Sequence, residues 1–182
     1  MQGYVNLDGK LYPRNPRATL RILAYGGVTG ATFRAVLREF DQWPNLDVGV
    51  IEGMANIDRG RSQIASRFLQ RPEAETGAVL LMVDADNAFR LDDLAYIAKL
   101  ALQHNAVVGG MYAKRIFGQG LAMRVAEYDR YQMGEERLIP CDYVGTGMIA
   151  IPRTILEHLS RDLPTVEGNF QPFFMPFLLE RN

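Results

Sequence analysis

Asp84 and Asp86 lie one residue apart, directly after the short apolar run of residues 78–83. That run is partly β-branched and contains no polar residue, which predicts a strand buried on both faces of a parallel sheet. The two carboxylates would then lie at the C-terminal end of the strand, where ligands bind in open α/β sheets. Two carboxylates at such an edge suit a divalent cation, Mg²⁺ or Mn²⁺, that also takes substrate phosphates as ligands.

Asp-X-Asp is a common pattern, and a second interpretation carries similar weight on spacing alone. In that interpretation the segment is an ordinary loop between a strand and a helix, and Asp86 or Asn87 caps the next helix. The strand before the pair favours the metal site.

Length and composition predict one domain with a real core. The chain has 182 residues, of which 48% are hydrophobic and 23% charged, with a net charge of −1. This charge requires neither a nucleic acid nor a membrane partner. One cysteine, Cys141, excludes an internal disulfide framework and predicts a cytoplasmic protein. We find neither a signal-peptide pattern nor an apolar run of transmembrane length.

Strands and helices alternate in the predicted pattern, which indicates the α/β class with a mostly parallel central sheet. We expect an irregular arm over residues 1–19 and a single domain over residues 20–182. The predicted strands cover residues 21–25, 46–52, 78–83, 106–110 and 142–151. The predicted helices begin at the N-caps Thr29 and Asp58, at Phe89 and at Pro152. Ile57, Ile64 (or Ala65) and Phe68 mark the apolar face of the second helix at helical spacing.

Further candidate residues follow other strands at the same predicted edge. Tyr25 and Gly26 after the first strand predict a ligand-lining loop or, equally, a tight turn that needs glycine. Glu52 ends the second strand and would accept hydrogen bonds from a base or ribose, or simply face solvent. Lys114 and Arg115 after the fourth strand would neutralise phosphates or be plain surface charge.

Arg61 lies in the first turns of a predicted helix, where the helix dipole disfavours a cation. We expect a nearby negative group to compensate, either Asp58 or a ligand phosphate. Gly145 and Gly147 interrupt the last predicted strand, which indicates a bulge or a close approach by a ligand. The aromatic tail, Phe170 to Leu179, must be covered either by the body of the domain or by missing sequence, and it is a candidate oligomer interface.

No Gly-x-Gly-x-x-Gly follows the first strand, and no Gly-x-x-x-x-Gly-Lys-Ser/Thr occurs, which argues against a dinucleotide oxidoreductase and a P-loop enzyme. The ordered motifs instead resemble those of GT-A fold nucleotide-sugar glycosyltransferases, in particular the family 2-like group of bacteria and phages. The matching segments are residues 22–27, 57–69, 80–86 and 144–153. Ser62 stands where the family usually has asparagine.

The resemblance implies a three-layer α/β/α GT-A fold and transfer of a sugar from a nucleoside diphosphate, most often a uridine one. In this family pattern Asp86 would hold Mn²⁺ or Mg²⁺, and Asp84 would contact the ribose or a metal-bound water. Arg61 would lie near the nucleotide, with Tyr25 and Gly26 lining the base. Gly145 and Gly147 would let the backbone approach the donor sugar or the acceptor.

Such enzymes usually carry a later acidic residue as catalytic base, and the chain ends at Asn182 without that segment. We therefore expect a fragment, an abbreviated enzyme or a relative without catalysis, with Asp142 as a stand-in base. The acceptor stays open among a polysaccharide, a protein, a lipid and a modified base. The alternatives are a sugar-nucleotide-binding or assembly domain and a metal-dependent nucleotidyltransferase. The second is disfavoured because the loop of residues 25–30 has no cation.

Overall fold

The computed structural model describes residues 4–7, 10–13, 16–39, 43–53, 56–110, 123–124, 138–141, 143–166 and 168–175. In chain order its helices and strands are β1 (Tyr4–Leu7), β2 (Lys10–Pro13), β3 (Ala18–Ala24), α1 (Gly30–Glu39), β4 (Leu46–Glu52), α2 (Ile57–Gln70), α3 (Glu73–Thr76), β5 (Val79–Asp84), α4 (Leu91–His104), β6 (Val108–Gly109), β7 (Met123–Arg124), β8 (Tyr143–Val144), β9 (Met148–Pro152) and α5 (Arg153–Ser160). None of the helices described is long and apolar enough to cross a membrane.

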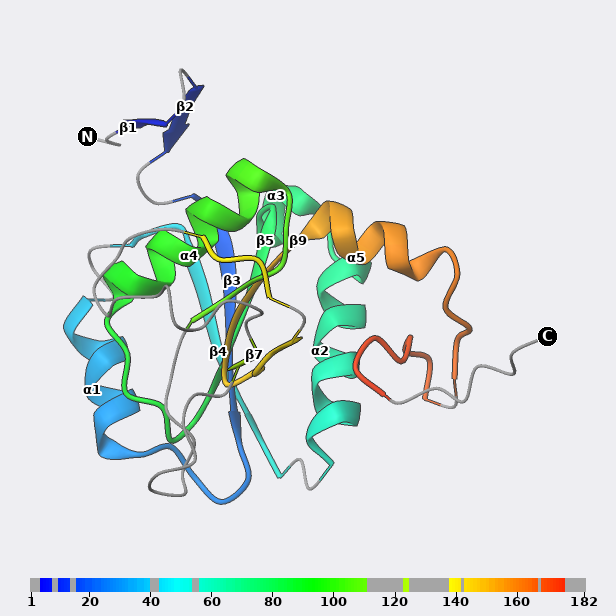
Figure 1. Cartoon of the computed structure of the whole chain (residues 1–182). Coiled ribbons are helices and arrows are strands. Elements are labelled where there is room, and N and C mark those ends of the chain that lie inside the picture. Colours follow the sequence, from blue (N-terminus) through cyan, green and yellow to red (C-terminus); the bar gives the residue numbers. More distant parts are fainter. Residues whose placement is uncertain are drawn as a thin grey trace.

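A five-stranded sheet in the order β4-β3-β5-β9-β6 forms the centre of the molecule (Figure 1). β3 pairs in parallel with both β4 and β5, whereas β9 lies antiparallel between β5 and β6. All strands of this sheet except β9 therefore run in one direction. The predicted α/β class with a mostly parallel sheet is confirmed, and the arrangement is consistent with the expected nucleotide-sugar transferase fold.

Helices cover both faces of this sheet and complete the three layers (Figure 1). α1 and α4 lie on one face, while α2 and α5 pack on the other. The helices α2, α4 and α5 turn apolar side chains such as Phe68, Leu94 and Leu156 toward the strands, as the helical spacing of apolar residues predicts, and α1 packs Val36 against the core.

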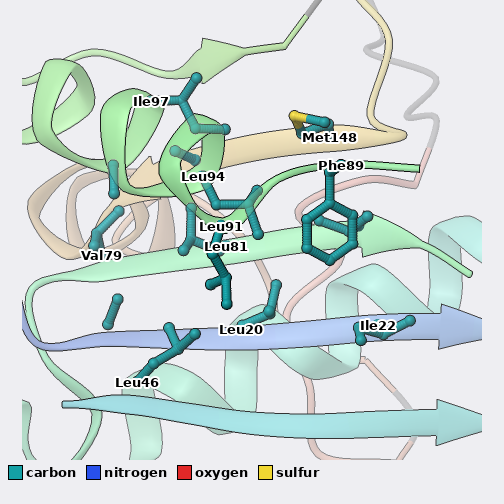
Figure 2. Close-up of a cluster of buried hydrophobic side chains, with 14 of the residues drawn as sticks. Leu20, Ile22, Leu46, Val79, Leu81, Phe89, Leu91, Leu94, Ile97 and Met148 are labelled. Carbon is teal, nitrogen blue, oxygen red and sulfur yellow. The ribbon is translucent and has the colours of Figure 1, made fainter. Parts of the chain in front are cut away.

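β5 alternates its side chains between the two halves of the core because neighbouring strand residues point to opposite faces. Leu81 packs in the α4-side cluster with Leu20 and Leu94 (Figure 2). Leu80 and Met82 belong to the cluster on the α2 and α5 side. All five side chains have no exposed surface, and each contributes roughly 1.5–3 kcal/mol by its burial. This burial on both faces fixes where β5 ends, and so where its terminal carboxylate lies.

The helix starts agree only in part with the prediction. Thr29 caps α1 as expected, because its hydroxyl accepts a hydrogen bond from the Thr32 N–H at 3.3 Å. Asp58 does not cap α2, however. Asn56 does so, accepting from the Arg59 N–H at 2.9 Å, and this places Asp58 inside the first turn, where the dipole favours a carboxylate.

Two predicted segments have a different local structure. The arm predicted as irregular contains an antiparallel pair, β1 with β2. Asp8-Gly9 stands between these strands in the sequence, a dipeptide typical of two-residue hairpin turns that the prediction overlooked. The strand predicted over residues 142–151 is two strands, because a turn at Thr146 and Gly147 separates β8 from β9.

The aromatic tail is covered by the body of the domain as far as the structure describes it. Phe170 is buried, and Phe173 and Phe174 pack against the cluster on the α2 side. These residues therefore form part of the core, not an exposed apolar surface. The oligomer expected through the tail has no support from them. Phe177 lies outside the described residues.

Candidate active site

Asp84 is the last residue of β5 and lies at the carboxyl edge of the sheet. Its position is fixed by the backbone on both sides. The Asp84 N–H donates to the Gly147 carbonyl at 2.9 Å, and the Asp84 carbonyl accepts from the Asn87 N–H at 3.0 Å. The carboxylate therefore stands where the sequence predicted it, at the start of a tight turn that exposes Asp86 to solvent.

Arg61 reaches this carboxylate from α2. Its Nη2 donates to Asp84 Oδ1 at 2.6 Å and to the Thr146 carbonyl at 3.3 Å. The Arg61 side chain is 6% exposed and that of Asp84 29%. The predicted partners of Arg61 were Asp58 or a ligand phosphate; the partner in the structure is Asp84. Sequence spacing gave no sign of this pair, which bridges 23 residues.

The segment after Asp84 is clamped by the start of α1. The Ala85 carbonyl accepts from the Thr29 N–H at 3.0 Å, and the buried Thr32 hydroxyl lies 2.8 Å from the same carbonyl. The Thr32 hydroxyl also lies 2.9 Å from the Asn87 carbonyl. α4 begins only at Leu91, so neither Asp86 nor Asn87 caps it, and the interpretation of this loop as a helix cap is wrong.

The loop between β8 and β9 supports the same turn. The Gly147 carbonyl accepts from the Asn87 side-chain amide at 2.7 Å as well as from the Asp84 N–H. Gly145 and Gly147 are both buried. Their place beside the carboxylate edge is established, while a contact with a sugar stays a prediction.

A cleft of ≈ 200 Å³ opens at this edge. Tyr25, Gly26, Asp84 and Asp86 contribute to its lining, as predicted from their positions after two neighbouring strands. Ile57 also lines it, and its sequence position gave no sign of a place in the site. The complete lining is Leu23, Ala24, Tyr25, Gly26, Gly27, Ile57, Asp84, Ala85 and Asp86. Among these described side chains there are two carboxylates and no cation.

Two of the lining side chains are apolar and largely exposed. Tyr25 is 79% exposed and Ile57 49%. Ile57 was expected in the core as part of the apolar face of α2, but it is the first residue of that helix and lies at its open end. The exposed apolar surface gives the cleft a region suited to a planar or apolar group, next to its acidic region.

Glu52 does not line the cleft. It ends β4 at the edge of the sheet, opposite Ala24 of β3, and is exposed. Asp142, Lys114 and Arg115 lie outside the described residues, so their predicted roles stay predictions.

Ser62 and Ser66 have a role that sequence reasoning missed. The Ser62 hydroxyl accepts from the Phe174 N–H at 3.0 Å, and the Ser66 hydroxyl accepts from the Gln171 N–H at 2.8 Å. Residues one helical turn apart lie on the same face of a helix. The small polar pair on α2 therefore holds the C-terminal segment alongside it. The sequence offered one signal for this contact, the i, i+4 spacing of two serines within a predicted helix. Both serines are buried in the structure.

The donor set fits a divalent cation only with help from a ligand. No group of three histidine, cysteine, aspartate or glutamate side chains able to hold a metal occurs among the described residues. Asp84 and Asp86 supply two carboxylates, and Mg²⁺ is commonly held by one or two carboxylates with phosphate oxygens and water completing its six ligands. The pair therefore fits a cation that enters with a phosphate ligand.

Comparisons with known proteins leave the family open. No protein-family model matches the chain, and no curated protein does. One similar solved structure is 4-diphosphocytidyl-2C-methyl-D-erythritol synthase from Anaerococcus prevotii, at 14% sequence identity and a TM-score of 0.40. The match covers 84% of this chain and 81% of that one. At this level of similarity neither family nor reaction is transferred.

Proposed function

We propose that this chain binds a nucleoside-diphosphate sugar in the cleft at the end of β5 and transfers the sugar to an acceptor hydroxyl. The observation that carries the proposal is the acidic turn at Asp84 and Asp86 on the central strand. This turn is held by Arg61, by hydrogen bonds that it accepts from the start of α1 and by hydrogen bonds that it donates to the β8–β9 loop, and it faces a cleft with exposed apolar surface.

The charges of the cleft support a requirement for metal. A diphosphate placed beside two carboxylates is repelled unless a cation lies between them. No lysine or arginine lines the cleft among the described residues, and the nearest buried cation, Arg61, is already paired with Asp84. A bound Mn²⁺ or Mg²⁺ would neutralise the charge that grows on the leaving diphosphate.

Each residue has a specific role in this proposal. Asp86 is exposed and would hold the cation, while Asp84, fixed by Arg61, would orient the ribose or a metal-bound water. Tyr25 and Gly26 would line the base, and Ile57 adds apolar surface on the helix side. Rigid placement of these groups matters because an error of 1 Å in position can lower a rate a hundredfold.

A sugar-nucleotide-binding domain without catalysis is the second candidate. It is favoured by the chemistry of the described lining, in which the only carboxylates are the two assigned to the metal and to Arg61. Asp142 remains the proposed base. The two candidates differ in one assay, since a glycosyltransferase slowly hydrolyses its donor in the absence of acceptor, whereas a binding domain releases it intact.

A nucleotidyltransferase is disfavoured by the same lining. Its nucleoside triphosphate carries more negative charge than a diphosphate sugar, and we expect cationic side chains in the loop after β3. The described cleft has none there.

The test is calorimetric titration of UDP into the protein, with and without Mn²⁺. We expect binding that requires Mn²⁺ and is lost in Asp86→Asn. Asp162→Asn is the matched control, because Asp162 is an exposed carboxylate in the turn after α5 and does not line the cleft. Failure of UDP and of the other nucleoside diphosphates to bind in the presence of metal would contradict the proposal.

A further inference from the structure

The pairing of Arg61 with Asp84 changes the charge that a cation meets in the cleft. Arg61 is among the few charged residues buried in the described part of the chain, with 5% of its surface exposed. Its only ion pair there is with Asp84. A guanidinium so close to a carboxylate cancels most of its field at a distance, and water reaches Asp84 but hardly Arg61.

The geometry also limits which oxygens of Asp84 are available. Oδ1 accepts a charge-assisted hydrogen bond at 2.6 Å, a short distance for such a pair. Arg61 is held in place because its Nη2 also donates to the Thr146 carbonyl and because its side chain is buried. A metal competing for Oδ1 would have to displace a buried cation, which is costly.

We infer that Arg61 serves as the built-in counter-ion of Asp84 and lowers the affinity of the cleft for a free divalent cation, so that the cation binds tightly only together with an anionic ligand. This inference rests on the proposed function for the identity of that ligand, a nucleoside diphosphate. The effect of Arg61 itself is on the affinity for the cation, whether or not a nucleotide is present. Asp84, Asp86 and Arg61 together carry a charge of −1, and the diphosphate supplies the further negative charge that attracts the cation.

We expect one substitution to change the affinity for Mn²⁺ in an unusual direction. Removing the positive charge of Arg61 strengthens the binding of Mn²⁺ alone, although it disturbs the packing around Asp84. A unit charge roughly 8 Å from a divalent cation changes its binding about sixfold at the dielectric constant of bulk water and more at the lower effective values near a protein surface, so about tenfold is a low expectation. If Arg61 were purely structural, its loss would lower the affinity for Mn²⁺, because it would loosen the turn that holds the carboxylates.

The experiment compares four proteins, each titrated with Mn²⁺ alone and followed by electron paramagnetic resonance of the free ion. Wild type carries a charge of −1 at the three residues, Arg61→Met −2, Asp84→Asn 0, and the double variant −1. We expect Arg61→Met to bind Mn²⁺ about tenfold more tightly than wild type. The double variant is expected to match wild type, and Asp84→Asn to bind about tenfold more weakly.

The double variant keeps the test decisive if Arg61→Met does not fold. It contains neither the buried cation nor its carboxylate partner, so no charge is left unpaired. The inference then requires the double variant to bind Mn²⁺ more tightly than Asp84→Asn. Equal affinity of these two proteins, or an Arg61→Met variant that folds and binds no more tightly than wild type, overturns it.

A separate measurement tests the proposed function. Its failure would appear as absence of UDP binding by wild type with saturating Mn²⁺, measured calorimetrically, whatever the order of the four affinities for the ion alone. Conversely, Mn²⁺-dependent UDP binding with the wrong order of affinities leaves the proposed function intact and removes the counter-ion role of Arg61.

Discussion

Arg153 offers the sharpest test of how the two helices on one face of the sheet are held. It is the first residue of α5, and its side chain is 7% exposed. One of its nitrogens donates to the carbonyls of Phe68 and Arg71, at 2.7 and 2.8 Å, and lies 2.8 Å from the Thr76 hydroxyl. The guanidinium also lies 4.5 Å from the centre of the Phe68 ring. Arg153 therefore satisfies carbonyl groups at the end of α2, which have no partner within the helix.

Arg153→Met removes these donors while keeping an apolar side chain of similar length. Each buried carbonyl left without a partner costs about 1–3 kcal/mol, and two are affected together with the ring contact. We expect the unfolding free energy to fall by about 3–5 kcal/mol. For a chain of this size each kcal/mol corresponds to about 2–4 °C, so the midpoint should fall by roughly 6–20 °C.

Urea unfolding followed by circular dichroism measures this change. Arg161→Met, at an exposed residue just after α5, is the matched control and should stay within about 0.5 kcal/mol of wild type. A loss of less than about 1 kcal/mol in Arg153→Met would refute the reasoning, since the carbonyls would then have found other partners at little cost.

Three further predictions concern the framework of the site. Thr32→Val should lower the unfolding free energy by about 1–2 kcal/mol and weaken Mn²⁺-dependent UDP binding. The reason is that it removes the buried hydroxyl that contacts the loop after β5. Urea unfolding measures the first effect and calorimetry the second. Gly77→Ala should cost about 3 kcal/mol or more in urea unfolding, because Gly77 has φ +79° and a Cβ there would lie 2.0 Å from the Arg17 carbonyl oxygen. The third prediction concerns pH. Partial burial raises the pKa of Asp47, but hydrogen bonds and charges from two arginines outweigh it and hold the pKa below its ordinary value of 3.8. The stabilisation from Asp47 is therefore present above that value and is lost as the pH falls through the lowered pKa. Asp47→Asn should accordingly lower stability near neutral pH, with the difference from wild type shrinking in acid unfolding curves below pH 3.8.

Each of these has a matched control. Thr165→Val changes an exposed threonine in the loop after α5 and should leave stability and UDP binding unchanged. Gly26→Ala places a Cβ in open space, so its stability should stay within about 0.5 kcal/mol of wild type. Asp162→Asn is the control for Asp47→Asn, because it removes an exposed carboxylate. Its stability should match that of wild type at every pH, with no difference that shrinks in acid. Equal effects in a variant and its control would contradict the contact in question.

The sequence was most informative where one strong local pattern decided the structure. The apolar run before Asp84 predicted a doubly buried strand, and β5 is that strand, with its carboxylate at the carboxyl edge of the sheet. β4 has the predicted bounds, Leu46–Glu52. Such patterns are local, since they depend on the alternation of side chains and on burial by whatever lies above and below.

The contacts that complete the site join segments far apart in the chain, and no local pattern predicts them. Arg61 was recognised as a cation in need of a partner, but its partner is 23 residues away. Ser62 was judged only as a departure from a family motif, whereas its hydroxyl binds a backbone N–H 112 residues later. Ile57 was placed on the apolar face of α2 by helical spacing, which does not show that the first residue of the helix stays exposed.

The most direct test of the central claim is a crystal structure of the protein with UDP and Mn²⁺, with the metal located by its anomalous scattering. We predict a single strong peak within about 2.5 Å of an Asp86 carboxylate oxygen and of diphosphate oxygens. We also expect Arg61 to remain paired with Asp84 in that complex. Nucleotide bound away from the end of β5, or a manganese peak with no contact to Asp86, would contradict the account.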